Sequence, residues 1–161
     1  METIAELLME PKTETIDFEI TFSSEYWNNP PSVEIIIDGE SQAKKILAKG
    51  DTVITFCKTL EFDQTHTIHI VRSGKTVEES RQLASGEWDT QSCSIKQMKI
   101  DGINIRNMIW HNSYFEPDYD EYQTGDKIVH GECMFGFNGT WTLDFTSPFY
   151  QCVVNFVRGT A

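Results

Sequence analysis

The chain is poor in basic residues: 13 lysines and arginines stand against 25 aspartates and glutamates, giving a net charge of −12. Such a charge repels nucleic acid phosphates and anionic membrane surfaces, so we expect neither as a partner. Long apolar runs are also missing, since crossing a bilayer takes about 20 residues and the runs here have the length of a strand. The segment Met1–Lys12 has no basic n-region, so no secretory signal is expected.

Cysteine is scarce and widely spread, at Cys57, Cys93, Cys133 and Cys152, with no CxxC pair. Four cysteines allow two disulfides in three connectivities. A chain of 161 residues buries roughly 70% of its unfolded surface as one domain and holds a core without cross-links. We therefore expect reduced thiols in the core, with disulfides as the alternative.

Motifs for catalysis are missing as well. Ser73–Thr76 reads Ser-Gly-Lys-Thr, the end of a phosphate-binding loop, but His69 stands where the first glycine of that loop belongs. His66 and His69 lie three apart, which on a strand places them on opposite faces rather than on one metal. No Gly-x-Ser-x-Gly elbow exposes a serine. The sequence therefore predicts no enzyme and leaves a hydrolase as a remote alternative.

Short runs of alternating apolar and polar residues fill most of the chain. In Thr15–Phe22 the apolar residues take every second position, which is the period of a strand with one buried face. A closing segment, Phe149–Val157, follows Pro148. Further strands are predicted at Val33–Ile37, Ala43–Leu47, Thr52–Leu60, Thr67–Arg72, Lys75–Glu78, Cys93–Ile100, Ile103–Ile109, Val129–Phe137 and Thr140–Phe145.

Turn residues separate these runs. Asp38-Gly39, Asp101-Gly102 and Asn138-Gly139 each predict a tight hairpin, because these pairs accept positive φ angles. Polar stretches at Glu79–Thr90 and Tyr114–Lys127 are predicted as loops. Strands at a spacing near ten residues predict an all-β fold, an antiparallel two-sheet β-sandwich over residues 13–161.

The first twelve residues form a separate pattern. Ile4, Leu7 and Leu8 share one helical stripe, and Pro11 ends it, so residues 1–12 are predicted as a short amphipathic helical arm. The arm either packs on its own domain or docks on a neighbouring subunit.

Aromatic residues gather in and beside the predicted loops. Flat rings next to carboxylates and amides are typical of sugar-binding surfaces, and aromatics are also enriched at protein interfaces. We expect Phe135, Phe137, Trp141 and Phe145 to belong to the core instead. The candidate residues for contact with a glycan or a protein partner are Trp27, Trp110, Tyr114, Phe115 and Tyr119.

The predicted loop Tyr114–Lys127 is rich in carboxylates, the ligands that Ca²⁺ prefers. It is not an EF-hand, because the sixth position from Asp118 is Gln123 and the twelfth is Val129. A hydrated acidic loop without metal is the favoured interpretation, and Ca²⁺ is the alternative.

Two stretches resemble small structural proteins of tailed bacteriophages, notably marine ones. The first joins Lys99–Ile103 to Met108–His111 and the aromatic, acidic Tyr114–Pro117; the second is Asn138–Phe145 followed by Pro148–Tyr150. These proteins look like jelly-roll sandwiches of the carbohydrate-binding-module type, and the resemblance spans about Val33 to Phe156. In calcium-dependent members the ligands are loop carboxylates, and the closest positions here are Asp118 and Asp120.

The resemblance implies a non-enzymatic virion protein, made in the host cytoplasm, that decorates the capsid or belongs to the tail or its fibres. Other virion proteins and copies of the same chain are then its partners. The alternative is a carbohydrate-binding module that adheres to host surface glycans, with Trp27, Trp110 and Tyr114 as a stacking platform.

Overall fold

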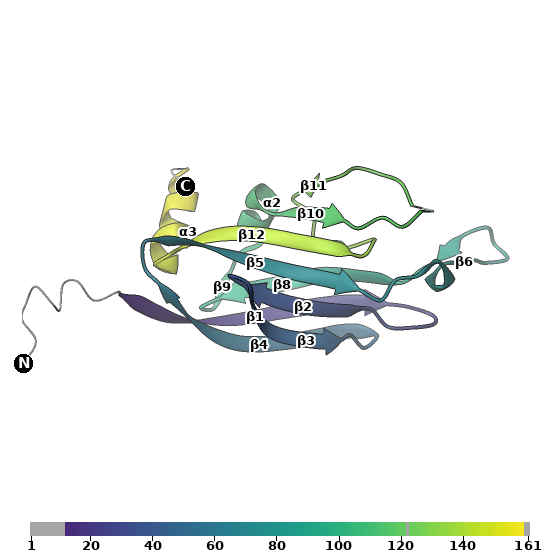
Figure 1. The fold of residues 1–161 in the computed structure, drawn as a ribbon, viewed down its shortest axis with the longest axis horizontal. Helices are drawn as coiled ribbons and strands as arrows, with labels where there is room; N and C mark the ends of the chain where they lie inside the picture. Colours follow the sequence, from purple (N-terminus) through teal and green to yellow (C-terminus); the bar gives the residue numbers. More distant parts are fainter. Residues whose placement is uncertain (1–11, 122, 160–161) are drawn as a thin grey trace, which may run out of the picture.

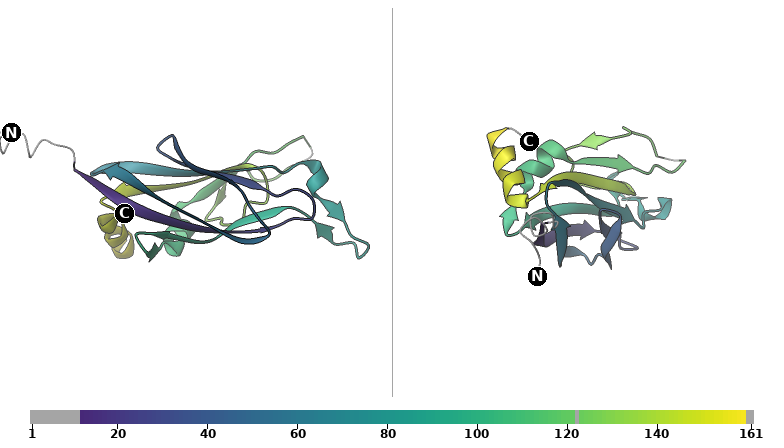
Figure 2. Two further views of the ribbon diagram at one scale, coloured as in Figure 1. Left: turned by 90° about the horizontal axis from the view of Figure 1, so that it is seen from below. Right: turned by 60° about the vertical axis from the view of Figure 1, so that its left-hand side comes forward.

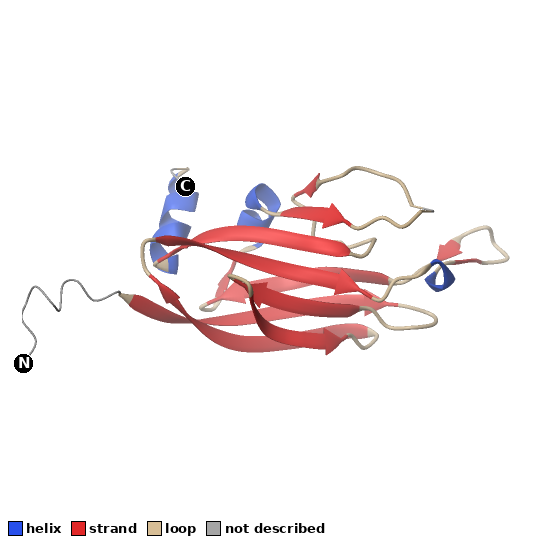
Figure 3. Ribbon diagram, in the orientation of Figure 1, coloured by secondary structure: helices blue, strands red, loops and turns tan. Residues whose placement is uncertain are grey.

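Two antiparallel sheets face each other in the computed structural model, which describes residues 12–121 and 123–159 (Figures 1 and 3). One sheet has the order β4-β1-β8-β9 and the other β11-β10-β12-β5-β2-β3, while β6 and β7 form a separate hairpin. The antiparallel β-sandwich predicted from the sequence is confirmed. The strands are β1 (Thr13–Glu25), β2 (Ser32–Ile37), β3 (Glu40–Ile46), β4 (Gly50–Glu61), β5 (Gln64–Ser73), β6 (Arg81–Gln82), β7 (Trp88–Asp89), β8 (Ser92–Ile100), β9 (Ile103–Asn104), β10 (Tyr114–Pro117), β11 (Val129–His130) and β12 (Gly139–Ser147).

The core lies between the sheets and follows the predicted alternation. On β1 every second residue from Ile16 to Phe22 is buried, and β5 and β12 contribute inward faces of the same kind. Trp141, Phe135 and Phe145 are buried as expected, whereas Phe137 is only half-buried. Period-two burial on paired strands therefore fixes which face of each sheet turns inward.

Two of the three predicted hairpins are confirmed. Asp38 and Gly39 have φ angles of 50° and 81°, and Asp101 and Gly102 have 49° and 75°. Both pairs join neighbouring antiparallel strands, β2 to β3 and β8 to β9. Aspartate accepts the left-handed region because its short side chain bonds locally.

The third hairpin, at Asn138-Gly139, is wrong. The Asn138 side chain accepts hydrogen bonds from Arg72 Nη1 and the Lys75 backbone N–H, both at 2.9 Å, and thereby ties this segment to the end of β5. The predicted strand Val129–Phe137 shrinks to β11, since Gly131 follows with a φ of 67°. In place of the predicted hairpin partner, β12 pairs with β10 on one side and with β5 on the other. The presence of β10 corrects the prediction that Tyr114–Lys127 is a loop throughout.

Helices replace three predicted elements. The run Ile103–Ile109 divides into β9 and helix α2 (Arg106–Asn112). Lys75–Glu78 is no strand either, because a 3₁₀ turn, η1 (Val77–Glu79), follows Gly74. The closing segment forms helix α3 (Phe149–Arg158). Helices α2 and α3 lie side by side at the end of the sandwich where β1 begins (Figures 1 and 2).

The remaining predictions meet the structure in part. The helical arm of residues 1–12 falls almost wholly outside the described residues. All four cysteines are free, but Cys57 is exposed on β4 rather than packed in the core. His66 is buried and His69 lies on the opposite face of β5, as expected. None of the helices that the structure describes is both long and apolar enough to cross a membrane.

Candidate functional site

A groove of about 650 Å³ opens between α2, α3 and the adjoining strands β5 and β12. This volume lies in the range of ligand pockets and exceeds that of each of the three other hollows described below. Apolar atoms of Met108, Phe145, Cys152 and Phe156 line it in part. The polar groups that line it are those of Thr65, His111, Asn112, Asp144, Thr146 and Asn155.

One wall of the groove is α2, which is held at its start by a hydrogen bond and in its middle by buried residues. The Asn104 side-chain oxygen accepts the Arg106 N–H at 3.0 Å, which satisfies a free donor at the start of the helix. Met108 and Ile109 anchor the helix in the core. His111 and Asn112 follow on its exposed last turn and border the groove.

The other wall is α3, which is tied to the first strand of the domain. A carboxylate oxygen of Glu14 accepts the Phe149 N–H at 2.8 Å and also bonds the Ser147 hydroxyl. This carboxylate stabilises the helix start through the helix dipole. Gly159 ends the helix with a φ of 73°.

Aromatic and amide groups meet at the mouth between the two helices. The His111 and Phe156 rings lie 5.9 Å apart at 52°, so the helices contribute one ring each. Gln151 donates a hydrogen bond of 2.8 Å to Asn155 on the next turn of α3. Planar faces and amide groups therefore lie together at this end of the sandwich.

The floor of the groove is polar and extends beyond its main chamber. The Thr67 hydroxyl donates to Asp144 across β5 and β12 at 2.6 Å, which holds that carboxylate in place. A second hollow of about 250 Å³ shares Thr65, Thr146 and Asn155 with the groove and adds Asp63. The two hollows therefore adjoin each other, and together they are called the α2–α3 groove below.

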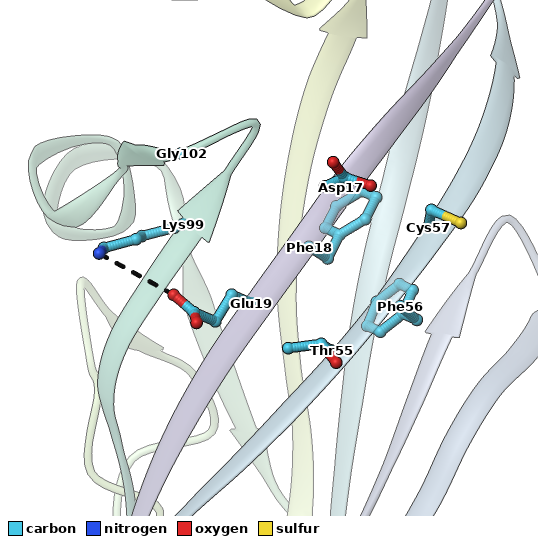
Figure 4. A pocket seen from close by; sticks show the side chains of 8 residues that line it. All are labelled: Asp17, Phe18, Glu19, Thr55, Phe56, Cys57, Lys99 and Gly102. Atoms are coloured by element: carbon cyan, nitrogen blue, oxygen red, sulfur yellow. Dashed lines mark ion pairs between the residues drawn. The ribbon is translucent and has the colours of Figure 1, made fainter.

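A third hollow lies on the four-stranded sheet and has a different character. It measures about 410 Å³ and is lined by residues of β1 and β4 together with Lys99 and Gly102 (Figure 4). Glu19 and Lys99 point toward one another there, 3.9 Å apart. The Phe18 ring stacks on Phe56 at 4.8 Å and is almost wholly buried. Glu19 and Lys99 thus pair with each other, and the Phe18 and Phe56 rings pack on each other. These groups are not free to contact a ligand, so we do not place one there.

The fourth hollow, also about 410 Å³, lies at the loop end, the end of the sandwich opposite α3, and includes the predicted residue Asp118. Arg72 lies at its base, where burial lowers the arginine pKa to about 10. Its guanidinium donates to Asn138 and, at 3.2 Å, to the Gln91 carbonyl. These bonds connect the loops of this end and give Arg72 a structural role.

The predicted calcium ligands are not gathered into a cluster. The Asp118 backbone N–H donates to the Asn138 carbonyl at 2.7 Å. The Asp120 backbone N–H donates to the Gln123 side-chain oxygen at 3.0 Å. Over residues 12–121 and 123–159, no three His, Cys, Asp or Glu side chains come together closely enough to hold a metal ion.

Three of the predicted contact aromatics have packing partners. Trp27 donates from Nε1 to the Glu79 carbonyl at 2.9 Å, and Arg81 lies 4.3 Å above its ring. The Tyr119 hydroxyl donates to the Asp126 carbonyl at 2.7 Å. Phe115 is only 2% exposed and stacks in the core, which corrects its assignment as a contact residue.

The other two predicted aromatics lie on α2 and on β10, and neither lines the groove. Trp110 is 70% exposed, yet on a helix it points about 150° away from the side that Met108, His111 and Asn112 present to the groove. Tyr114 is half-buried on β10, with the His130 ring 6.4 Å away. Sequence reasoning missed the groove because its walls were not predicted as helices, although Phe149, Cys152 and Phe156 have helical spacing.

Comparison with known proteins identifies the fold. No family model matches the chain, and no curated protein does. A solved structure of vCBM60 in complex with galactobiose is similar over 79% of this chain and 96% of its own, with a TM-score of 0.51 and 12% identity. A second structure is a selenomethionine form of vCBM60, described in connection with circular permutation between two families of calcium-dependent carbohydrate-binding modules. It is similar over 80% of this chain and 89% of its own, with a TM-score of 0.47 and 11% identity. The comparisons give the bacteriophage resemblance no support, and the chain has a β-sandwich fold like that of the carbohydrate-binding module vCBM60.

Proposed function

We propose that this protein is a non-catalytic carbohydrate-binding module and that an oligosaccharide lies in the α2–α3 groove. The observation that carries the proposal is the composition of the α2–α3 groove, whose lining combines ring faces, amides, hydroxyls and carboxylates. Sugars present apolar C–H faces and many hydroxyls, and each kind of group has a counterpart here.

The fold adds to this argument. The structural neighbour vCBM60 is seen in complex with galactobiose. A sandwich of this kind supplies a rigid frame, and binding residues held on helices and strands keep their positions without a ligand. No observation on the described residues favours virion assembly over glycan binding.

The test is calorimetric titration of the purified chain with galacto-oligosaccharides, comparing Asn112→Ala with Asn107→Ala. Both residues are exposed asparagines on α2, but only Asn112 lines the groove. Losing one hydrogen bond to a ligand corresponds to about 3- to 10-fold weaker binding. We expect this loss for Asn112→Ala and unchanged binding for Asn107→Ala.

A third variant, Trp110→Ala, tests the exposed platform predicted from the sequence. Loss of binding in Trp110→Ala with full binding in Asn112→Ala overturns the assignment to the groove. Absence of binding to every glycan of a broad array overturns the proposed function itself.

A further inference from the structure

The α2–α3 groove has a one-sided charge. Among the described residues that line its two hollows, Asp63 and Asp144 are carboxylates, and no lysine or arginine is present. Two more carboxylates bond lining residues: Glu61 accepts from the Gln64 amide at 2.6 Å, and Glu14 accepts from the Ser147 hydroxyl. A ligand in this groove therefore meets two lining carboxylates, with two more behind the lining, and no lining lysine or arginine among the described residues.

Asp144 is fixed through its carboxylate and Asp63 through its backbone. Thr67 fixes Asp144 through a hydrogen bond of 2.6 Å. Asp63 lies in a left-handed turn, with a φ of 59°, and its N–H bonds the Ser147 carbonyl at 2.7 Å. Asp144 lines the larger hollow and Asp63 the smaller one, so each of the two adjoining hollows has one carboxylate.

Resting on the proposed function, we propose that this groove selects glycans by charge: it binds neutral and amine-bearing oligosaccharides and rejects chains that carry uronate or sulfate groups. Two unit charges about 4 Å apart interact by about 1 kcal/mol even in bulk water, which corresponds to about fivefold in affinity. An ammonium group on a sugar instead gains a charge-assisted hydrogen bond to a carboxylate.

The test uses two pairs of ligands that differ in charge and are matched in length. The first pair is a neutral galacto-oligosaccharide and an oligogalacturonate, and the second is a chito-oligosaccharide and its deacetylated, amine-bearing form. At pH 7 and low salt we expect the acidic member to bind at least about fivefold more weakly than the neutral one. The amine-bearing member is expected to bind more tightly than its acetylated form, and 0.5 M salt is expected to shrink both differences.

Variants then locate the effect. Asp144→Asn keeps an oxygen that accepts from Thr67 and removes the negative charge. It should therefore reduce the difference in affinity within each of the two ligand pairs. Asp63→Asn should do the same, since asparagine tolerates a left-handed φ. Glu87→Gln is the control, because it changes the net charge equally on the exposed β6–β7 connection at the opposite end (Figure 1).

Equal binding of acidic and neutral members, or an equal effect of Glu87→Gln and Asp144→Asn, overturns the selectivity. Binding of none of the four ligands, nor of any other glycan, is a failure of the proposed function, so the two failures differ in their results.

Discussion

Replacing Gly139 by alanine tests the pairing of β12 with β10, which the sequence did not predict. Gly139 lies between Arg72 of β5 and Pro117 of β10. A Cβ atom there would meet the Glu116 carbonyl oxygen, Phe115 Cζ at 2.8 Å and Pro117 Cα at 2.9 Å. Two of these contacts are with backbone, which cannot turn aside as the end of a side chain does. Overpacking of this kind costs about 1–3 kcal/mol.

The assay is thermal unfolding followed by circular dichroism. For a chain of this size 1 kcal/mol shifts Tm by about 2–4 °C, so a cost near 2 kcal/mol lowers it by about 4–8 °C. Gly136→Ala is the matched control, because a Cβ at Gly136 meets nothing within 4 Å and its φ is not in the left-handed region. We expect Gly136→Ala to leave Tm unchanged or to raise it slightly. Equal Tm values for the two variants would refute the close packing of β10 on β12.

Three further predictions concern a buried thiol and two half-buried polar side chains. Burial raises the pKa of the Cys93 thiol from 9.0 to about 11. Its contribution to the free energy of unfolding, roughly 3 kcal/mol, is therefore complete below pH 9 and lost as the pH rises from 9 through 11. Chemical denaturation should show this decrease in the wild type and not in Cys93→Ala. Glu14→Gln weakens two charge-assisted hydrogen bonds at the start of α3, so the free energy of unfolding should decrease by about 1–2 kcal/mol, and a change under 0.5 kcal/mol would speak against this anchor. Asn138→Ala removes three hydrogen bonds and leaves buried Arg72 short of an acceptor, so urea unfolding should show a loss of about 3 kcal/mol, whereas a loss near zero would deny that Asn138 connects the two loops.

The strands could be predicted because their physics is local. Alternation with a period of two, as in β1, specifies a strand and its buried face at once. Asp38-Gly39 and Asp101-Gly102 then fix the turns through their φ preferences. Asn138-Gly139 misled the prediction because its asparagine bonds two residues more than 60 positions earlier in the chain, and no local pattern records such a contact.

The candidate groove could not be predicted because it is assembled from distant segments. Its residues come from β5, α2, β12 and α3. Val153 and Val154 are β-branched and favour a strand, although they lie in α3. The apolar run before Trp110 is too short to show a helical period, so α2 was predicted as part of a strand. The helical spacing of Phe149, Cys152 and Phe156 is visible in the sequence. The Glu14 carboxylate that accepts the N–H at the start of this helix, however, lies 135 residues earlier in the chain.

The central claim is that a glycan lies between α2 and α3, and amide chemical-shift mapping during titration with a galacto-oligosaccharide tests it most directly. We predict the largest shifts at residues 111–112, 144–146 and 155–156, with little change at the loop end around Trp27 and Asp118. Shifts concentrated at the loop end or around Trp110 and Tyr114 would contradict the assignment of the site. Unchanged spectra with every glycan tried would contradict the proposed function.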